Sequence, residues 1–197
     1  IINKYGVDAV RWYFYTANPP GEPKNFDEAD VGKSSRRFHA ILWNSLVFYK
    51  TYAASLHPKS YILNPKHVLD VWILARLHEP TEETTKNLER YDIRAAALAL
   101  EAFVDDLSRW YIRRSRRRLQ RPENQGDYGA ASETLGFVLR ELVKLIAPFT
   151  PFFAELLFEQ FRRQAQTKRR QTQKSSGDRD VMSVHLANWP KSDIRYR

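Results

Sequence analysis

Apolar residues recur at helical spacing along most long segments of this chain, and prolines separate those segments. One stripe consists of Leu100, Phe103, Val104, Leu107, Trp110 and Tyr111, and another of Leu135, Val138, Leu139, Leu142 and Ile146. Residues three and four positions apart share one face of an α-helix. Only 7 of the 197 residues are glycine, so the turns that a sheet sandwich needs are scarce. The pattern predicts an all-α fold, an antiparallel helix bundle.

Capping residues and prolines set the expected limits of the helices. We expect helices over about 3–16, 28–55, 65–90, 93–120, 130–147 and 151–164, with a short extended segment at 183–186. Asp27 and Asp92 are suited to cap helix N-termini, and Thr150 before Pro151 gives a similar signal. Pro80 is expected to kink its helix or split it in two. Residues 164–180 are rich in Gln, Lys, Arg and Ser without an apolar stripe, so we expect them to be mobile.

Composition excludes several classes of protein. The chain has no cysteine, which rules out disulfides and thiolate zinc sites, and none of its five histidines pairs with another at helical spacing. We therefore expect no metal site. No segment approaches the ~20 apolar residues of a membrane span, so we expect no membrane partner and a cytoplasmic location. Asp105 and Asp106 are adjacent carboxylates, and neighbours on a helix diverge by about 100°. We expect no catalytic residues.

The densest chemical signal is a run of seven arginines between positions 109 and 121. On a regular helix, Arg114 and Arg118 continue the apolar face, so that end must either leave the bundle or meet partners there. Asp105 can pair with Arg109, and Asp106 can reach Arg109 or Arg113. The surplus cations, and a net charge of +9, favour a polyanion such as nucleic acid. The alternative is an exposed helix end whose cations face its negative dipole terminus.

The planar guanidinium group of arginine can bind two phosphate oxygens at once, so the arginines of this run are the candidate phosphate contacts. We predict the main phosphate contacts at Arg113, Arg116, Arg117 and Arg121. Lys33 and Arg36, on the outer side of the predicted 28–55 helix, form a weaker second patch. Eight large aromatic residues fall on apolar stripes, and we interpret them as core: Trp43, Phe48, Tyr49, Trp72, Phe103, Phe149, Phe152 and Phe153. We place Trp110 and Tyr111 at the base of the predicted phosphate-contact surface.

Several longer motifs carry a family resemblance. They are YGVDAVRWY at 5–13, LWN at 42–44, DVWILARL at 70–77, FVDDLSRWYIRRSRRR at 103–118, LIAPFTPF at 145–152 and VHLANWP at 184–190. In this order they resemble the class I aminoacyl-tRNA synthetases for isoleucine, valine and leucine. The stretch WYIRRSRRR at 110–118 resembles the isoleucine branch in particular.

The resemblance implies a helical anticodon-binding domain that binds tRNA(Ile) beside the remaining domains of a synthetase. Residues 1–24 would end the connecting region after a catalytic domain, 25–163 would form the anticodon-binding domain, and 164–197 would be a flexible basic segment and C-terminal extension. The chain lacks the family's His-Ile-Gly-His and Lys-Met-Ser-Lys-Ser motifs, which handle ATP. We therefore expect an inactive fragment without a cofactor, cut from a longer enzyme that uses ATP and Mg²⁺.

Two alternatives to this interpretation remain open at the level of sequence. One is the equivalent fragment of a valyl- or leucyl-tRNA synthetase. The other is a non-catalytic helical interaction module with a basic face.

Overall fold

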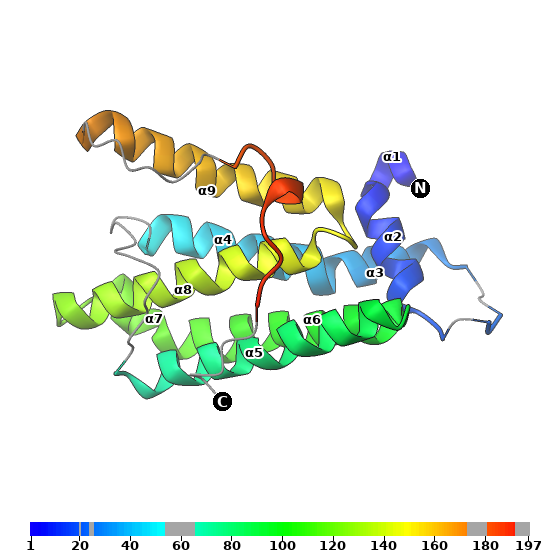
Figure 1. Cartoon of the computed structure of the whole chain (residues 1–197), viewed down its shortest axis with the longest axis horizontal. Coiled ribbons are helices and arrows are strands. Elements are labelled where there is room, and N and C mark those ends of the chain that lie inside the picture. The colour runs from blue at the N-terminus through cyan, green and yellow to red at the C-terminus, as the bar shows by residue number, and fades with distance from the viewer. Residues whose placement is uncertain (20, 24–25, 54–65, 173–180, 192–197) are drawn as a thin grey trace.

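The protein is an elongated bundle whose long helices run roughly along one axis, with the two N-terminal helices set across one end (Figure 1). The computed structural model describes residues 1–19, 21–23, 26–53, 66–172 and 181–191, without the side chains of 164–172. Every regular element in those ranges is helical. Successive long helices alternate in direction, as the colour gradient shows (Figure 1). The predicted all-α antiparallel bundle is confirmed.

The elements in chain order are α1 (Ile2–Tyr5), α2 (Val7–Thr16), α3 (Glu28–Ser35), the π-helical η1 (Arg36–Ala40), α4 (Ile41–Tyr52), α5 (Val68–Glu89), α6 (Ile93–Asp105), the π-helical η2 (Asp106–Ile112), α7 (Arg113–Gln120), α8 (Gln125–Ile146), α9 (Pro151–Thr172) and the 3₁₀ turn η3 (Val184–Leu186). The segments α3, η1 and α4 form one helical run, and so do α6, η2 and α7.

Two predicted helices differ from the structure at a glycine and a proline. The helix expected over 3–16 is interrupted at Gly6, whose φ of 84° is the left-handed region that favours glycine. Pro80 does not split its helix, because α5 continues through it from Val68 to Glu89. Pro80 is buried, α5 packs along α6, and the hydroxyl of Thr81 donates to the carbonyl of Leu77 at 2.8 Å. Tertiary packing here outweighs the backbone hydrogen bond that proline removes.

Three other boundaries also differ from the sequence prediction. Helix α8 begins at Gln125, five residues early, because the side chain of Asn124 accepts from two backbone N–H groups of its first turn. Helix α9 continues to Thr172 rather than 164, consistent with the high helix propensity of Gln, Lys and Arg. Residues 184–186 form a 3₁₀ turn instead of an extended segment. The predicted start at Pro65 and the mobile stretch over 173–180 lie outside the described residues.

The core lies between α4, α6, α8 and the helices that flank them. Leu42, Leu100, Leu107, Leu135 and Leu139 are at most 1% exposed. A Cβ on Gly136 of α8 would lie 2.7 Å from the hydroxyl oxygen of Tyr49, so α4 and α8 approach closely at that glycine. The interpretation of the aromatics as core holds for most of them. It is wrong for Trp43 and Phe152, which are 37% and 69% exposed.

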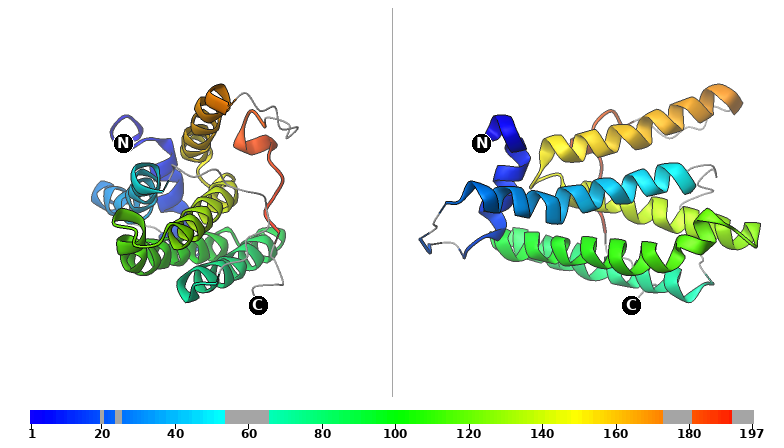
Figure 2. Two further views of the ribbon diagram at one scale, coloured as in Figure 1. Left: turned by 90° about the vertical axis from the view of Figure 1, so that its left-hand side faces the viewer. Right: turned by 180° about the vertical axis from the view of Figure 1, so that it is seen from behind.

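Hydrogen bonds attach both the N-terminal helix α2 and the segment over 181–191 to the bundle. Asp8 of α2 accepts from the backbone N–H of Phe153 at 2.6 Å, which caps the first turn of α9. The segment after residue 181 crosses from α9 over α8 towards α5 (Figures 1 and 2). There the backbone N–H of Val184 donates to Glu155, and the indole N–H of Trp189 donates to Thr85 at 2.9 Å. No helix in the described ranges is long and apolar enough to cross a membrane.

Candidate nucleic-acid interface

Helix α7 and the residues just after it present a row of guanidinium groups at one end of the bundle. All four arginines predicted as phosphate contacts are exposed. They surround one hollow of about 660 Å³, lined by Arg113, Arg114, Arg116, Arg117, Gln120, Arg121 and Glu123. The structure therefore brings the four predicted residues together in one place.

Positive charge dominates this hollow, which we call the arginine hollow and define by the seven residues that line it. Five of those residues are arginine, and Glu123 is the one acid among them. Glu123 pairs with Arg117, and both side chains are more than three-quarters exposed. Arg116 lies over the ring of Phe48 in α4, with its guanidinium carbon 5.9 Å from the ring centroid. One carboxylate cannot neutralise five guanidinium groups, so the hollow suits an anionic ligand.

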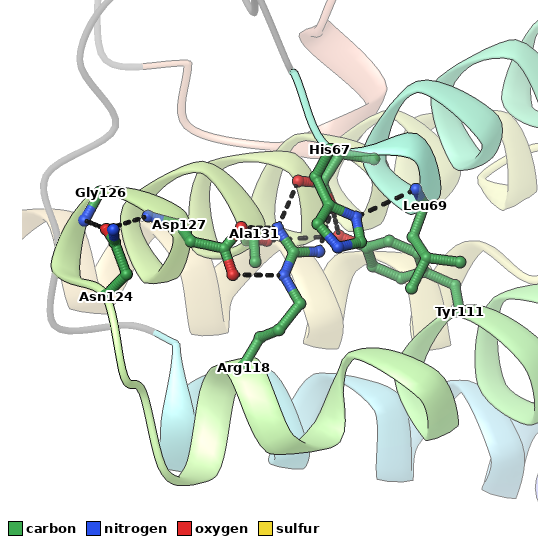
Figure 3. A network of polar contacts seen from close by, with 9 residues as sticks. His67, Leu69, Tyr111, Arg118, Asn124, Gly126, Asp127 and Ala131 are labelled. Atoms are coloured by element: carbon green, nitrogen blue, oxygen red, sulfur yellow. Dashed lines mark hydrogen bonds and ion pairs between the residues drawn. The ribbon is translucent and has the colours of Figure 1, made fainter.

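A different arginine of the same helix faces inward. The guanidinium of Arg118 donates to both carboxylate oxygens of Asp70, at 2.9 and 2.8 Å. It also donates to both oxygens of Asp127, at 2.8 and 2.6 Å. The hydroxyl of Tyr111 donates to Asp70 at 2.7 Å. We call Asp70, Tyr111, Arg118 and Asp127 the Arg118 network. Figure 3 labels Tyr111, Arg118 and Asp127 of this network.

The Arg118 network fixes α7 to its neighbours, because its members come from α5, η2, α7 and α8. Asp70 is fully buried, and the Arg118 side chain is 11% exposed. A buried carboxylate needs such partners, since removing a charge from water is costly. The hollow thus lies on a helix whose inner side is held by two bidentate ion pairs.

The network also shifts the protonation of its members. Burial by itself would lower the pKa of Arg118, but the hydrogen bonds to Asp70 and Asp127 outweigh it and raise that pKa. Burial, and then the negative charge of Asp70, raise the pKa of Tyr111 well above its ordinary value. The hydrogen bond from Arg118 lowers the pKa of Asp127. Arg118 and Asp127 therefore stay charged, and Tyr111 stays a donor, at neutral pH.

The π-helical segment η2 explains why a regular helical wheel misplaces Arg114. A π-turn holds an extra residue, so the helix after it is rotated relative to a regular wheel. The buried positions beyond η2 are Ser115 and Leu119, rather than Arg114. Arg114 is exposed, so its predicted place on the core face is wrong. Arg118 meets buried partners, which is one of the two outcomes expected for this end of the helix.

One predicted ion pair is confirmed, and one is wrong. Arg109 pairs with Asp105 at 2.7 Å, as expected for residues four apart. Asp106 pairs with Arg76 of α5 at 2.8 Å, rather than with Arg109 or Arg113. Helix α5 lies against η2 and supplies this cation from outside the helix, which spacing along one helix cannot reveal.

The second predicted patch lies far from the arginine hollow. Lys33 and Arg36 belong to α3 and η1, at the end of the bundle opposite α7 (Figures 1 and 2). Both are exposed, but Lys33 donates to Asp30 at 2.8 Å, and this bond raises the pKa of Lys33. The structure therefore does not bring this patch together with the four arginines.

The described ranges contain no cluster of side chains that could form a metal site. Those ranges hold no group of three or more His, Cys, Asp or Glu side chains placed to ligate a metal ion. The described residues therefore do not fit the Mg²⁺ that the resemblance implies for a longer protein.

The fold and its cationic end define a class of helical domain from tRNA ligases. A family model described as the anticodon-binding domain of tRNA ligase matches residues 70–196. Isoleucine–tRNA ligases from Dehalococcoides mccartyi and Thermus thermophilus are 41% and 38% identical to the chain, each over 98% of it. The chain therefore belongs to the family of anticodon-binding domains of tRNA ligases, and the relatives it is similar to are isoleucine–tRNA ligases. It spans 18% of the length of each of these two relatives.

Solved structures of other synthetases share the fold. The LeuRS of Agrobacterium radiobacter K84, in a ternary complex with tRNA and LeuAMS, gives a TM-score of 0.65 at 20% identity, over 99% of this chain and 20% of that one. The methionyl-tRNA synthetase of Mycobacterium tuberculosis also gives 0.65, at 21% identity over 80% of this chain and 32% of that one. At such identities the likeness concerns the fold alone.

Proposed function

We propose that this chain binds tRNA(Ile) through the arginine hollow and holds it for aminoacylation by other domains of the same synthetase. Arg113, Arg116, Arg117 and Arg121 contact backbone phosphates, and Lys33 and Arg36 form a separate, weaker patch. The observation that carries the proposal is the gathering of these four arginines around one hollow with a single acid. Phosphate oxygens are the natural acceptors for guanidinium forks.

The Arg118 network supports the proposal by preorganising the site. Because Arg118 is anchored to Asp70 and Asp127, α7 is already in place before a ligand arrives. A rigid support lowers the entropic cost of binding. The outer arginines then act on a fixed backbone.

The rest of the proposal concerns the longer protein. We place ATP, Mg²⁺ and the chemical step in domains outside this chain, in a cytoplasmic isoleucine–tRNA ligase. We assign residues 1–24 to the connection with the catalytic domain, 25–163 to tRNA binding, and 164–197 to a basic C-terminal extension. In this scheme the chain itself is inactive and positions the tRNA.

A filter-binding titration of tRNA(Ile) against salt tests the proposal. Four neutralised phosphates predict that log K falls with log salt with a slope of about −3. A tRNA with a different anticodon serves as the competitor for specificity. Failure to bind at low salt, or binding that ignores salt, would show that the hollow does not bind a phosphate backbone.

A further inference from the structure

An exposed stack of two planar side chains lies at the edge of the arginine hollow. The guanidinium carbon of Arg114 lies 3.7 Å from the ring centroid of Trp110, which is van der Waals contact. Trp110 is 46% exposed although its helical neighbours Leu107 and Tyr111 are fully buried. A cation over an indole ring contributes about 0.5–1 kcal/mol at an exposed site. The contact therefore holds the guanidinium of Arg114 against the ring in the absence of any ligand.

The inner side of this stack is fixed by a second indole. The ring centroids of Trp72 and Trp110 lie 6.3 Å apart, with the ring planes tilted by 53°. Trp72 comes from α5 and packs against the core. Trp110 is thus supported by the bundle on one side and carries Arg114 on another.

Arg114 belongs both to the stack and to the arginine hollow. The arginine hollow is a shallow depression that is largely open to solvent. Its walls therefore offer a planar surface next to several phosphate-binding cations. That combination matches single-stranded nucleic acid, whose bases are free to stack on aromatic rings and guanidinium planes. A duplex keeps its bases stacked inside and presents mainly phosphates to such a surface.

We infer that Arg114 and Trp110 form a stacking site for one unpaired nucleobase of the RNA that occupies the arginine hollow. The inference rests on the proposed function, because the phosphates flanking this base are those that Arg113, Arg117 and Arg121 contact. Every base has a flat face, so the site discriminates unpaired from paired RNA and tolerates any base. It adds a contact of a different chemical kind to the phosphate contacts.

Two RNAs and two variants of the whole 197-residue chain test this inference. One RNA is a hairpin with a single-stranded loop, and the other is a blunt duplex with the same number of phosphates. Arg114→Lys keeps the charge but loses the plane, and Trp110→Leu removes the ring. We expect each variant to weaken hairpin binding by about five- to a hundredfold and duplex binding by less than about twofold. The salt slope for the hairpin should stay the same.

Trp43→Leu is the matched control, since Trp43 is a 37% exposed tryptophan of α4 outside the hollow. It should leave both affinities unchanged. A hairpin with one loop base replaced by an abasic site adds a readout that a loss of folding cannot mimic. For at least one loop position, that abasic hairpin should bind the unaltered chain as weakly as the intact hairpin binds Trp110→Leu.

The outcomes separate the two proposals. Equal losses for hairpin and duplex, or a full affinity for every abasic hairpin, would overturn the stacking site and leave the phosphate contacts standing. If the unaltered chain binds neither RNA at low salt, both the stacking site and the proposed function are overturned.

Discussion

Arg117 and Arg118 are neighbours on α7, yet they belong to two regions with opposite properties. The side chain of Arg117 is 80% exposed and pairs with an equally exposed Glu123. That of Arg118 is 11% exposed and pairs with Asp70, which is fully buried. Residue type therefore does not decide what an arginine does here. The role of each arginine depends on the burial of its carboxylate partner. A buried carboxylate without a counterion is costly, whereas an exposed carboxylate is solvated by water.

The inner and outer sides of this short helix therefore have different roles. The inner arginine stabilises the fold, and the outer arginines remain available for a ligand. Substitutions on the inner side should change the free energy of unfolding, and those on the outer side should change RNA binding.

Arg118→Met should have the largest effect on stability. It leaves the buried Asp70 with a hydroxyl partner but no counterion. We expect the free energy of unfolding to fall by about 3–5 kcal/mol, measured by urea denaturation. Arg117→Met, the matched control one position away, should change it by less than about 0.5 kcal/mol. Similar values for the two variants would break the distinction between the inner and outer arginines.

Tyr111→Phe should have the next largest effect. The variant removes a buried hydroxyl that donates to Asp70 at 2.7 Å, and hydrogen bonds to charged groups contribute about 1.5–3 kcal/mol. We expect a loss of that size in the same denaturation experiment. The control is Tyr128→Phe, which removes a hydroxyl that donates to the carbonyl of Tyr52 at an exposed site. A greater loss for Tyr128→Phe than for Tyr111→Phe would contradict the importance of the buried network.

Asp127→Asn should have a smaller effect that depends on pH. Arg118 lowers the pKa of Asp127 in the folded state below the value of 3.8 for a free side chain. Its contribution is therefore complete above that value and is lost as the pH falls through the folded pKa. Because Asp127 is 36% exposed, we expect a loss of less than about 1 kcal/mol at pH 7.

The gap in unfolding free energy between Asp127→Asn and the unaltered chain should close as the pH falls below about 4. Denaturation series at several pH values will measure it. A gap of constant size down to pH 3 would mean that Asp127 does not act through its charge.

Much of the fold could be predicted from the sequence, because the apolar stripes and caps are local signals. Asp92 caps α6 as predicted, with its side chain accepting from Ala95 at 2.9 Å. The predictions that failed concern features that depend on tertiary contacts. Pro80 lies inside α5 because packing against α6 sustains that helix, and η2 rotates α7 in a way that a regular wheel cannot foresee.

The exposure of the outer arginines in the candidate site could also be predicted, and the partners of the inner arginine could not. An excess of arginines over nearby acids is visible in the sequence, and the hollow gathers the four chosen residues. The partners of Arg118 lie 48 residues before it in the chain and 9 after it. A usable signal did exist: Asp70 lies within the apolar stripe of its helix, so it required a buried cation. The stack of Arg114 on Trp110 could not be predicted, because a regular helical wheel places Arg114 on the core face.

Replacing Arg113, Arg116, Arg117 and Arg121 together by glutamine tests whether these four side chains bind the tRNA backbone. The salt dependence of tRNA binding and the free energy of unfolding are measured on the same variant. We expect the slope of log K against log salt to become shallower by about 3 units, while the free energy of unfolding changes by less than about 1 kcal/mol. A folded variant that binds tRNA with unchanged affinity and unchanged slope would contradict it.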